Sequence, residues 1–157
     1  MSHIHLTTFI TAPAKRVFDL SRSIRLHKIS AASVKGEVIG GISSGLINNE
    51  ESVTWQARHL FKKRQFTSTI TEMESPVSFV DEMTKGDFKS FRHQHHFKQV
   101  DNGTIMIDIV DFQSPYGILG SIVNKFFLKK YIENFLAKRN NIIKEYAESE
   151  KWNLILN

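Results

Sequence analysis

Near residue 114 the hydrophobic period of the chain changes from that of strands to that of a long helix, and this change constrains the fold more than any other feature. Between residues 45 and 112, apolar and polar side chains alternate in successive segments separated by turn residues, which is typical of half-buried antiparallel strands. From residue 114 to residue 146, apolar residues recur every three or four positions, which predicts a helix of about eight turns. We therefore expect a meander of strands followed by one long C-terminal helix.

The first 45 residues predict a strand, two short helices and a loop. Residues 4–11 alternate as a strand, and Pro13 lies near the first position of a helix. Ser21 or Ser23 is a candidate cap for a second short helix. Residues 30–45 are rich in serine and glycine, which indicates a loop with a short strand near residues 37–39.

These elements together predict an α+β fold. We expect a curved antiparallel sheet of about six to seven strands, wrapped on the long C-terminal helix, with two short helices after the first strand. The length suits one hydrophobic core, so residues 1–157 are expected to form a single domain. A curved sheet that wraps over one helix tends to leave a space between them.

Composition excludes several classes of protein. The chain has no cysteine, so disulfide scaffolds, thiolate metal sites and cysteine nucleophiles are excluded. We find no signal peptide pattern and no apolar run near the ~20 residues of a membrane helix, so we expect a cytoplasmic protein without stable membrane insertion. The net charge of +5 is spread along the chain without a recognition motif, so no nucleic-acid partner is expected.

Residues 91–98, with the sequence FRHQHHFK, place two histidines on an apolar strand face. Side chains alternate across a strand, so Phe91, His93, His95 and Phe97 share one face. The opposite face is entirely polar and is expected to meet solvent. Two imidazoles on an inner face indicate either the polar patch of a binding cavity or a reactive site.

The turn at Asn102-Gly103 fixes a register for the strand that follows. Asn-Gly favours a two-residue type I′ turn, which pairs His95 with Val110 and places Asp108 on the histidine face. Asp108 is then diagonal to His95 and within its reach. A three-residue loop would instead put Asp108 on the outer face.

The same register places Ile105, Ile107 and Ile109 on the outer face of the sheet. An exposed row of this kind indicates a surface for a protein partner or for a homodimer. The other interpretation is that the register is wrong.

The preceding strands supply further inner residues. A three-residue loop at residues 85–87 pairs Phe79 with His93 and places Phe79, Asp81 and Met83 on the inner face. In an earlier strand, alternation places Trp55, Ala57, His59 and Phe61 inside. The predicted inner wall is therefore aromatic with embedded histidines and carboxylates, and His59 and Asp81 are expected to join the cluster around His93.

Several segments resemble the SRPBCC superfamily, the START-like or helix-grip domains. Residues 9–18, FITAPAKRVF, are similar to the superfamily's opening motif, and the order of elements matches over residues 4–147. Residues 79–83 (FVDEM), 93–95 (HQH), 103–108 (GTIMID) and 114–117 (SPYG) resemble an uncharacterised bacterial branch. The resemblance implies a cavity for a small hydrophobic ligand. Superfamily members include lipid and hormone binders, polyketide cyclases and aromatases, hydrolase-like proteins and co-chaperones, so fold alone leaves function open.

The candidate ligand-binding residues combine the inner strand faces with the helix that the fold places over them. They are Trp55, His59, Phe79, Asp81, Met83, Phe91, His93, His95, Phe97, Met106, Asp108, Phe112, Leu119, Val123 and Phe127. The expected ligand is a small hydrophobic or amphipathic molecule, such as a lipid, with its polar end at the histidines.

Other functions of the same residues stay open. His93 and His95 could form a structural network with Asp108 and Asp81, because buried polar groups usually satisfy one another. As an enzyme of the cyclase, aromatase or hydrolase type, the chain would use His93 or His95 with Asp108 as an acid–base pair. The same three residues form a two-histidine, one-carboxylate set. No metal spacing motif, nucleophile or phosphate loop accompanies them, so we expect no metal, no cofactor and a binding protein rather than an enzyme.

Overall fold

The computed structural model describes residues 1–114 and 122–157, with side chains from residue 125 onward in the second range. The described residues form seven strands and four α-helices. The elements are β1 (Ser2–Ile10), α1 (Ala14–Ser21), α2 (Ile24–Ser30), the 3₁₀ turn η1 (Ala32–Val34), β2 (Glu37–Gly41), β3 (Ser52–His59), β4 (Lys62–Glu74), β5 (Ser78–Lys85), β6 (Ser90–Val100), β7 (Gly103–Gln113), α3 (Ile122–Glu148) and α4 (Trp152–Leu156).

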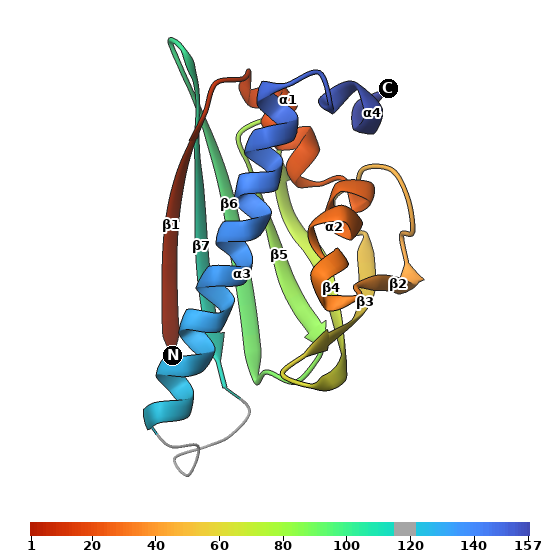
Figure 1. Cartoon of the computed structure of the whole chain (residues 1–157), viewed down its shortest axis with the longest axis vertical. Helices are drawn as coiled ribbons and strands as arrows, with labels where there is room; N and C mark the ends of the chain where they lie inside the picture. The colour runs from red at the N-terminus through yellow and green to blue at the C-terminus, as the bar shows by residue number, and fades with distance from the viewer. Residues whose placement is uncertain (115–121) are drawn as a thin grey trace.

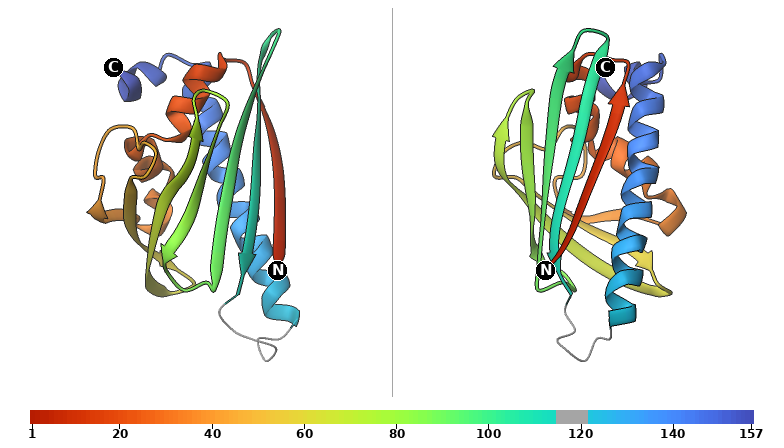
Figure 2. Two further views of the ribbon diagram at one scale, coloured as in Figure 1. Left: turned by 180° about the vertical axis from the view of Figure 1, so that it is seen from behind. Right: turned by 90° about the vertical axis from the view of Figure 1, so that its left-hand side faces the viewer.

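The strands form one antiparallel sheet that curves around α3. The order is β1-β7-β6-β5-β4-β3-β2, so the meander runs from β2 to β7 and β1 closes its far edge. Figure 1 shows α3 lying along the concave side of the sheet, with α1 and α2 beside it. The edge-on view in Figure 2 shows the helices on the same side. The predicted α+β helix-grip architecture is confirmed.

The core forms where α1 and α3 press on the concave face. Phe18 of α1 is fully buried and meets Phe79 and Phe97 edge to face, with ring centroids 5.6 and 5.3 Å apart. Ile132 and Leu136 of α3 pack in a second cluster with strand residues. Each buried side chain of this size contributes about 1.5–3 kcal/mol. The two clusters therefore fix α3 on the sheet.

The chain ends in a short helix that the sequence pattern did not reveal. Trp152 of α4 lies under the guanidinium of Arg16, 4.3 Å from ring centroid to Cζ. Ser23 caps α2 as expected, and its Oγ accepts from the Leu26 amide at 3.2 Å. The predicted start of the long helix at Ser114-Pro115 lies partly outside the described residues. No described helix is long and apolar enough to span a membrane.

The β6–β7 hairpin differs from the predicted register by two residues. The turn consists of Asp101 and Asn102, and His95 pairs directly with Asp108. Neither turn residue is among those with positive φ, so the turn is not type I′. Gly103 is needed for another reason: a Cβ there would lie 2.3 Å from the Ile10 carbonyl oxygen of β1. Because a shift of two residues preserves the faces, the prediction that Asp108 shares the histidine face is confirmed.

The β5–β6 hairpin shows the same kind of error. Phe79 pairs with His95 and Asp81 with His93, two residues from the predicted partners. The loop between the strands is longer than three residues, because β5 ends at Lys85 and β6 begins at Ser90. The inner face is again correct, since Phe79 is buried and Asp81 lines the concave side.

The isoleucine row of β7 lies on the outer, convex face. Ile105, Ile107 and Ile109 are half-buried and lie beside Phe9, Thr7 and His5 of β1. The helices cover the opposite face (Figure 2). A partner or a second copy on this row stays a prediction.

The β3–β4 turn has the type I′ backbone conformation that we expected for the β6–β7 turn. His59 pairs with Lys62, and the two residues between them, Leu60 and Phe61, have φ values of 52° and 68°. Two positive φ values in a two-residue hairpin are the signature of a type I′ turn. The Phe61 side chain is 97% exposed, so the prediction that Phe61 lies inside was wrong.

Candidate functional site: a cavity with a polar cluster at its wall

A cavity of about 640 Å³ lies between the concave face of the sheet and helices α2 and α3. Ligand pockets in proteins fall in this range, at roughly 300–1,000 Å³. The wall is predominantly apolar. Its apolar members include Ile24, Val53, Trp55, Ile70, Phe79, Phe91, Phe127, Leu128, Ile132, Phe135 and Leu136.

Asp108 is the centre of a closed hydrogen-bond network beneath this wall. Its side chain is 0% exposed, and Oδ1 accepts from Arg139 at 2.6 Å and from His93 Nε2 at 2.8 Å. Oδ2 accepts from the Asn140 amide at 2.7 Å. The Arg139 guanidinium also donates to the Asn140 side-chain oxygen at 2.7 Å. Asp108 is therefore satisfied by the protein itself.

Asp81 is the cavity-facing carboxylate of the same cluster. Its Oδ2 accepts from His95 Nε2 at 2.7 Å and lies 3.9 Å from His93 Nδ1. The side chain remains 18% exposed and lines the cavity. The two histidine rings stack with centroids 3.7 Å apart, between Asp81 and Asp108. His95 also stacks on Phe79 at 4.0 Å, which fixes its orientation.

The charges of the cluster follow from these contacts. Burial alone would raise the pKa of Asp108, but the Arg139 charge and the histidine hydrogen bonds hold that pKa well below its ordinary value. The hydrogen bond from His95 likewise overcomes burial and keeps the pKa of Asp81 low. Burial and the neighbouring His95 lower the pKa of His93 to about 4. At neutral pH both carboxylates are ionised and His93 is neutral.

His27 of α2 is a further imidazole on the cavity wall. It lines the cavity and meets Trp55 edge to face, with ring centroids 6.2 Å apart. Burial away from bulk solvent, followed by the charge of Arg139, lowers the pKa of His27 to about 3. The sequence analysis missed this residue because α2 is too short to show a clear apolar stripe.

His59 does not join the carboxylate cluster, contrary to our expectation. Its Nδ1 lies 2.6 Å from the Tyr131 hydroxyl of α3, and its ring packs on Phe135 at 5.3 Å. Burial lowers the pKa of His59 and raises that of Tyr131. This pair joins β3 to α3 across the cavity, close to the β3–β4 turn.

The predicted site residues divide into four groups. Eight line the cavity: Trp55, His59, Phe79, Asp81, Phe91, His93, His95 and Phe127. Four are buried in the core behind the wall instead: Phe97, Met106, Asp108 and Phe112. Met83 is partly buried beside the β5–β6 loop. Leu119 and the side chain of Val123 lie outside the described residues.

Two polar residues of α3 were missed as members of the cluster. Basic side chains on a long helix are expected to meet solvent, but Arg139 is 6% exposed and Asn140 is 2% exposed. Their spacing from Leu136 and Ile143 places them on the buried face of the helix, and this signal was available in the sequence. An arginine there is explained only by a buried carboxylate opposite.

The arrangement also brings together groups that could ligate a metal. One atom each of Asp81, His93 and His95 lies within 4.8 Å of the others. Asp81 takes the place that Asp108 has in the two-histidine, one-carboxylate set of the sequence analysis, because the Asp108 oxygens accept from Arg139, Asn140 and His93. The separation of 2.7 Å between His95 Nε2 and Asp81 Oδ2 is a hydrogen-bond distance, so in this structure the two groups bond to each other.

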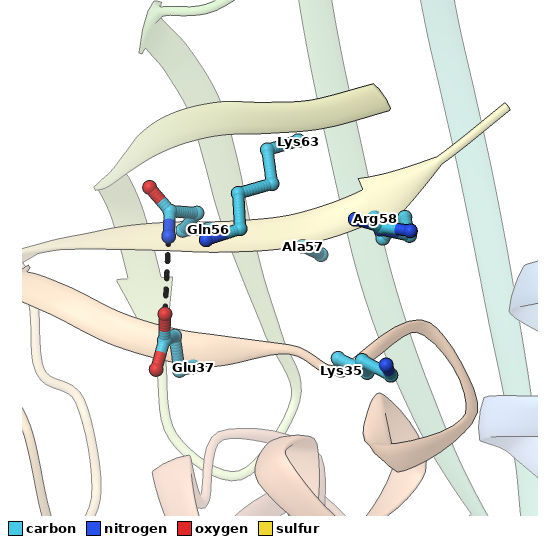
Figure 3. Close-up of a pocket in the computed structure, with 6 residues that line it drawn as sticks. All are labelled: Lys35, Glu37, Gln56, Ala57, Arg58 and Lys63. Carbon is cyan, nitrogen blue, oxygen red and sulfur yellow. Dashed lines mark hydrogen bonds between the residues drawn. The ribbon is translucent and has the colours of Figure 1, made fainter. Parts of the chain in front are cut away.

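A second hollow lies on the other side of β3, near the β2 edge. It has a volume of about 350 Å³ and is lined by Lys35, Glu37, Gln56, Ala57, Arg58 and Lys63. Figure 3 shows the Gln56 amide donating to Glu37 Oε1, at 3.0 Å. Its polar groups are exposed and satisfy one another or meet solvent, so we assign it no function.

At the level of sequence, no family model matches the chain, and no curated protein does either. Solved structures do match. An aromatase/cyclase, ZhuI from Streptomyces sp. R1128, superposes with a TM-score of 0.73 at 14% identity over 94% of this chain and 93% of that chain. A START superfamily protein from Mycobacterium smegmatis gives a TM-score of 0.68 at 12% identity, over 91% and 97%. The major latex-like protein 151 of Panax ginseng gives 0.67 at 12%, over 94% and 98%.

These identities are low, and what they show is the architecture. The seven-stranded sheet, the short helices after β1 and the long C-terminal helix all have counterparts over nearly the full length of each chain. The protein therefore has the helix-grip fold, which it shares with these three structures.

Proposed function

We propose that the chain acts as a single domain that binds a small hydrophobic or amphipathic molecule in the cavity between the sheet and α3. The observation that carries this proposal is the combination of an apolar space of about 640 Å³ with one polar patch on its wall. An apolar ligand gains about 25 cal/mol per Å² of surface removed from water. The patch of Asp81, His93 and His95 would orient the polar end.

Blocking the cavity tests this proposal. Ser68 lies on the inner face of β4 and lines the cavity, whereas Thr71 on the same strand is exposed. Ser68→Phe should fill the space and abolish ligand binding, and Thr71→Phe should leave it unchanged. Native mass spectrometry of purified protein, with organic extraction of bound lipids, measures both. Equal ligand occupancy in the two variants would contradict a ligand in this cavity.

A second candidate function is catalysis in the same cavity. The observation in its favour is the His95–Asp81 pair at the wall, because imidazole next to a carboxylate can act in acid–base chemistry near neutral pH. The partner differs from our expectation, since Asp108 is sealed by Arg139 and Asn140. Recovering a bound molecule chemically changed by the wild type but not by His95→Ala would support catalysis. A pH–rate profile that is unaffected by His93→Ala and His95→Ala would exclude it.

A further inference from the structure

Most charged side chains that line the cavity have an oppositely charged partner, and the exception lies at one point of the wall. Three arginines line the cavity, and each pairs with a carboxylate, although Asp19, the partner of Arg22, also pairs with the exposed Lys15. Arg22 pairs with Asp19 at 2.9 Å, Arg64 with Asp87 at 2.6 Å and Arg139 with Asp108 at 2.6 Å. The positive charges of the wall are therefore already matched.

Asp81 is the carboxylate left over. Within the described part of the chain, no lysine or arginine lies within 4.0 Å of it, and its ion-pair partners are the histidines His93 and His95. Neither partner is a lysine or an arginine, so Asp81 lacks the permanent positive charge that each arginine of the wall gives to its own partner. The side chain is open to the cavity, so a ligand can reach it.

We infer that the cavity selects amphipathic ligands whose polar end donates hydrogen bonds, with organic amines preferred over alcohols and alcohols over carboxylates. This inference rests on the proposed ligand-binding function. An ammonium group would pair with Asp81 in an environment of low dielectric, where such a contact is stronger than in water. A carboxylate would lie beside Asp81 and be repelled.

The titratable side chains that face Asp81 from the neighbouring strand and helices are consistent with a preference for amines over alcohols and for alcohols over carboxylates. His93 and His95 of β6 face it from the neighbouring strand, and His27 of α2 faces the same space. Arg139 of α3 is held by Asp108 and Asn140. The protein as a whole carries a net charge of +5, which by itself would favour anions. A preference for amines would therefore come from the cavity and not from the general field of the protein.

The experiment compares three ligands with the same chain: dodecylamine, dodecanol and dodecanoate, below their aggregation concentrations at pH 7. Trp55 lines the cavity and provides the fluorescence signal once Trp152, the other tryptophan, is replaced by Phe. Calorimetry on the unmodified protein checks the fluorescence. We expect dodecylamine to bind at least about tenfold more tightly than dodecanoate, with dodecanol between them.

Asp81→Asn tests the residue, and Glu82→Gln is the charge-matched control. Glu82 is adjacent but lies on the outer face, where it pairs with Arg92 at 2.9 Å. Asp81→Asn should reduce dodecylamine affinity by about tenfold and leave dodecanol within about threefold, whereas Glu82→Gln should change neither.

The outcomes separate this inference from the proposed function. If dodecanoate binds wild-type protein as tightly as dodecylamine, the ligand class is wrong although the cavity binds ligands. If Asp81→Asn retains the amine preference, Asp81 is not the residue that selects the ligand, and the inference fails at its premise. If none of the three ligands binds, both proposals fail. The wild-type ranking does not depend on the variant, so the inference remains testable even if Asp81→Asn does not fold.

Discussion

Asp108 and Asp81 lie at two edges of the same stacked histidine pair, yet their surroundings differ in kind. Asp108 accepts hydrogen bonds from Arg139, Asn140 and His93 and has no exposed surface. Asp81 accepts from His95 and opens onto the cavity. One cluster therefore serves two purposes. The Asp108 side joins α3 to the sheet, and the Asp81 side is free to meet a ligand.

Removing the charge of Asp108 should have the largest effect on stability. Asp108→Asn leaves Arg139 buried without a counterion, which typically costs about 3–5 kcal/mol in the free energy of unfolding. Asp111→Asn on the outer face of β7 is the control, because that carboxylate is partly exposed and should cost less than about 1 kcal/mol. Urea denaturation measures both.

A double variant tests whether the unpaired charge of Arg139 causes the loss of stability in Asp108→Asn. Replacing both partners, as Asp108→Leu with Arg139→Met, removes the buried charges together and should recover a large part of the loss. A double variant no more stable than Asp108→Asn would show that the contacts of this pair, rather than its charge balance, stabilise the fold.

Acid should weaken the fold first through its buried histidines. The folded-state pKa values of His27 (about 3) and His93 (about 4) lie below the ordinary 6.5, so between pH 6.5 and pH 4 the unfolded chain binds more protons. The free energy of unfolding therefore falls by a few kcal/mol as the pH drops through this window. Below it, the stability contributed by the low pKa values of Asp81 and Asp108 is lost as well.

Substitution identifies the source of this pH dependence. His27→Gln removes one of the two groups and should make the slope of stability against pH shallower. His5→Gln on the exposed face of β1 should not. An unchanged slope in His27→Gln would mean that His27 binds as many protons in the folded chain as in the unfolded chain, so that burial does not lower its pKa.

Substitutions in the β3–β4 turn should raise the free energy of unfolding, in contrast to those in the Asp108 cluster. Leu60 and Phe61 adopt positive φ, which costs of order 1 kcal/mol for each bulky residue. Leu60→Asn with Phe61→Gly supplies the residues that a type I′ turn prefers and should raise the free energy of unfolding by about 1 kcal/mol. Thermal unfolding at neutral pH measures this gain. A loss of stability would show that Leu60 packs usefully against the cavity wall.

Much of the fold could be predicted from the sequence because alternation and helical spacing are local patterns. Both hairpin registers were wrong by two residues, yet every face of β5, β6 and β7 was right, since a shift of two preserves the side of each side chain. The Asn102-Gly103 sequence led to the wrong turn prediction. Gly103 is needed because the β1 backbone lies close to it, and that contact joins residues distant in sequence.

The site was harder to predict because its polarity depends on contacts between distant elements. Asp108 and Asp81 looked alike in the sequence, and only the position of Arg139 and Asn140 on the buried face of α3 separates them. His59 was grouped with the cluster by alternation alone, but Tyr131 of α3 holds it elsewhere. Partners of this kind depend on how helix and sheet are aligned, which the local pattern does not specify.

The division between the two carboxylates is tested most directly by the unfolding free energy of Asp81→Asn, with and without dodecylamine. Without ligand, we expect a change below about 1 kcal/mol from wild type, because Asp81 has no lysine or arginine partner and the asparagine oxygen can still accept from His95. With ligand at about 100 times the wild-type Kd, wild type should gain about 2.7 kcal/mol and Asp81→Asn much less. A loss in Asp81→Asn without ligand that equals the loss in Asp108→Asn would contradict the account, because both carboxylates would then be structural.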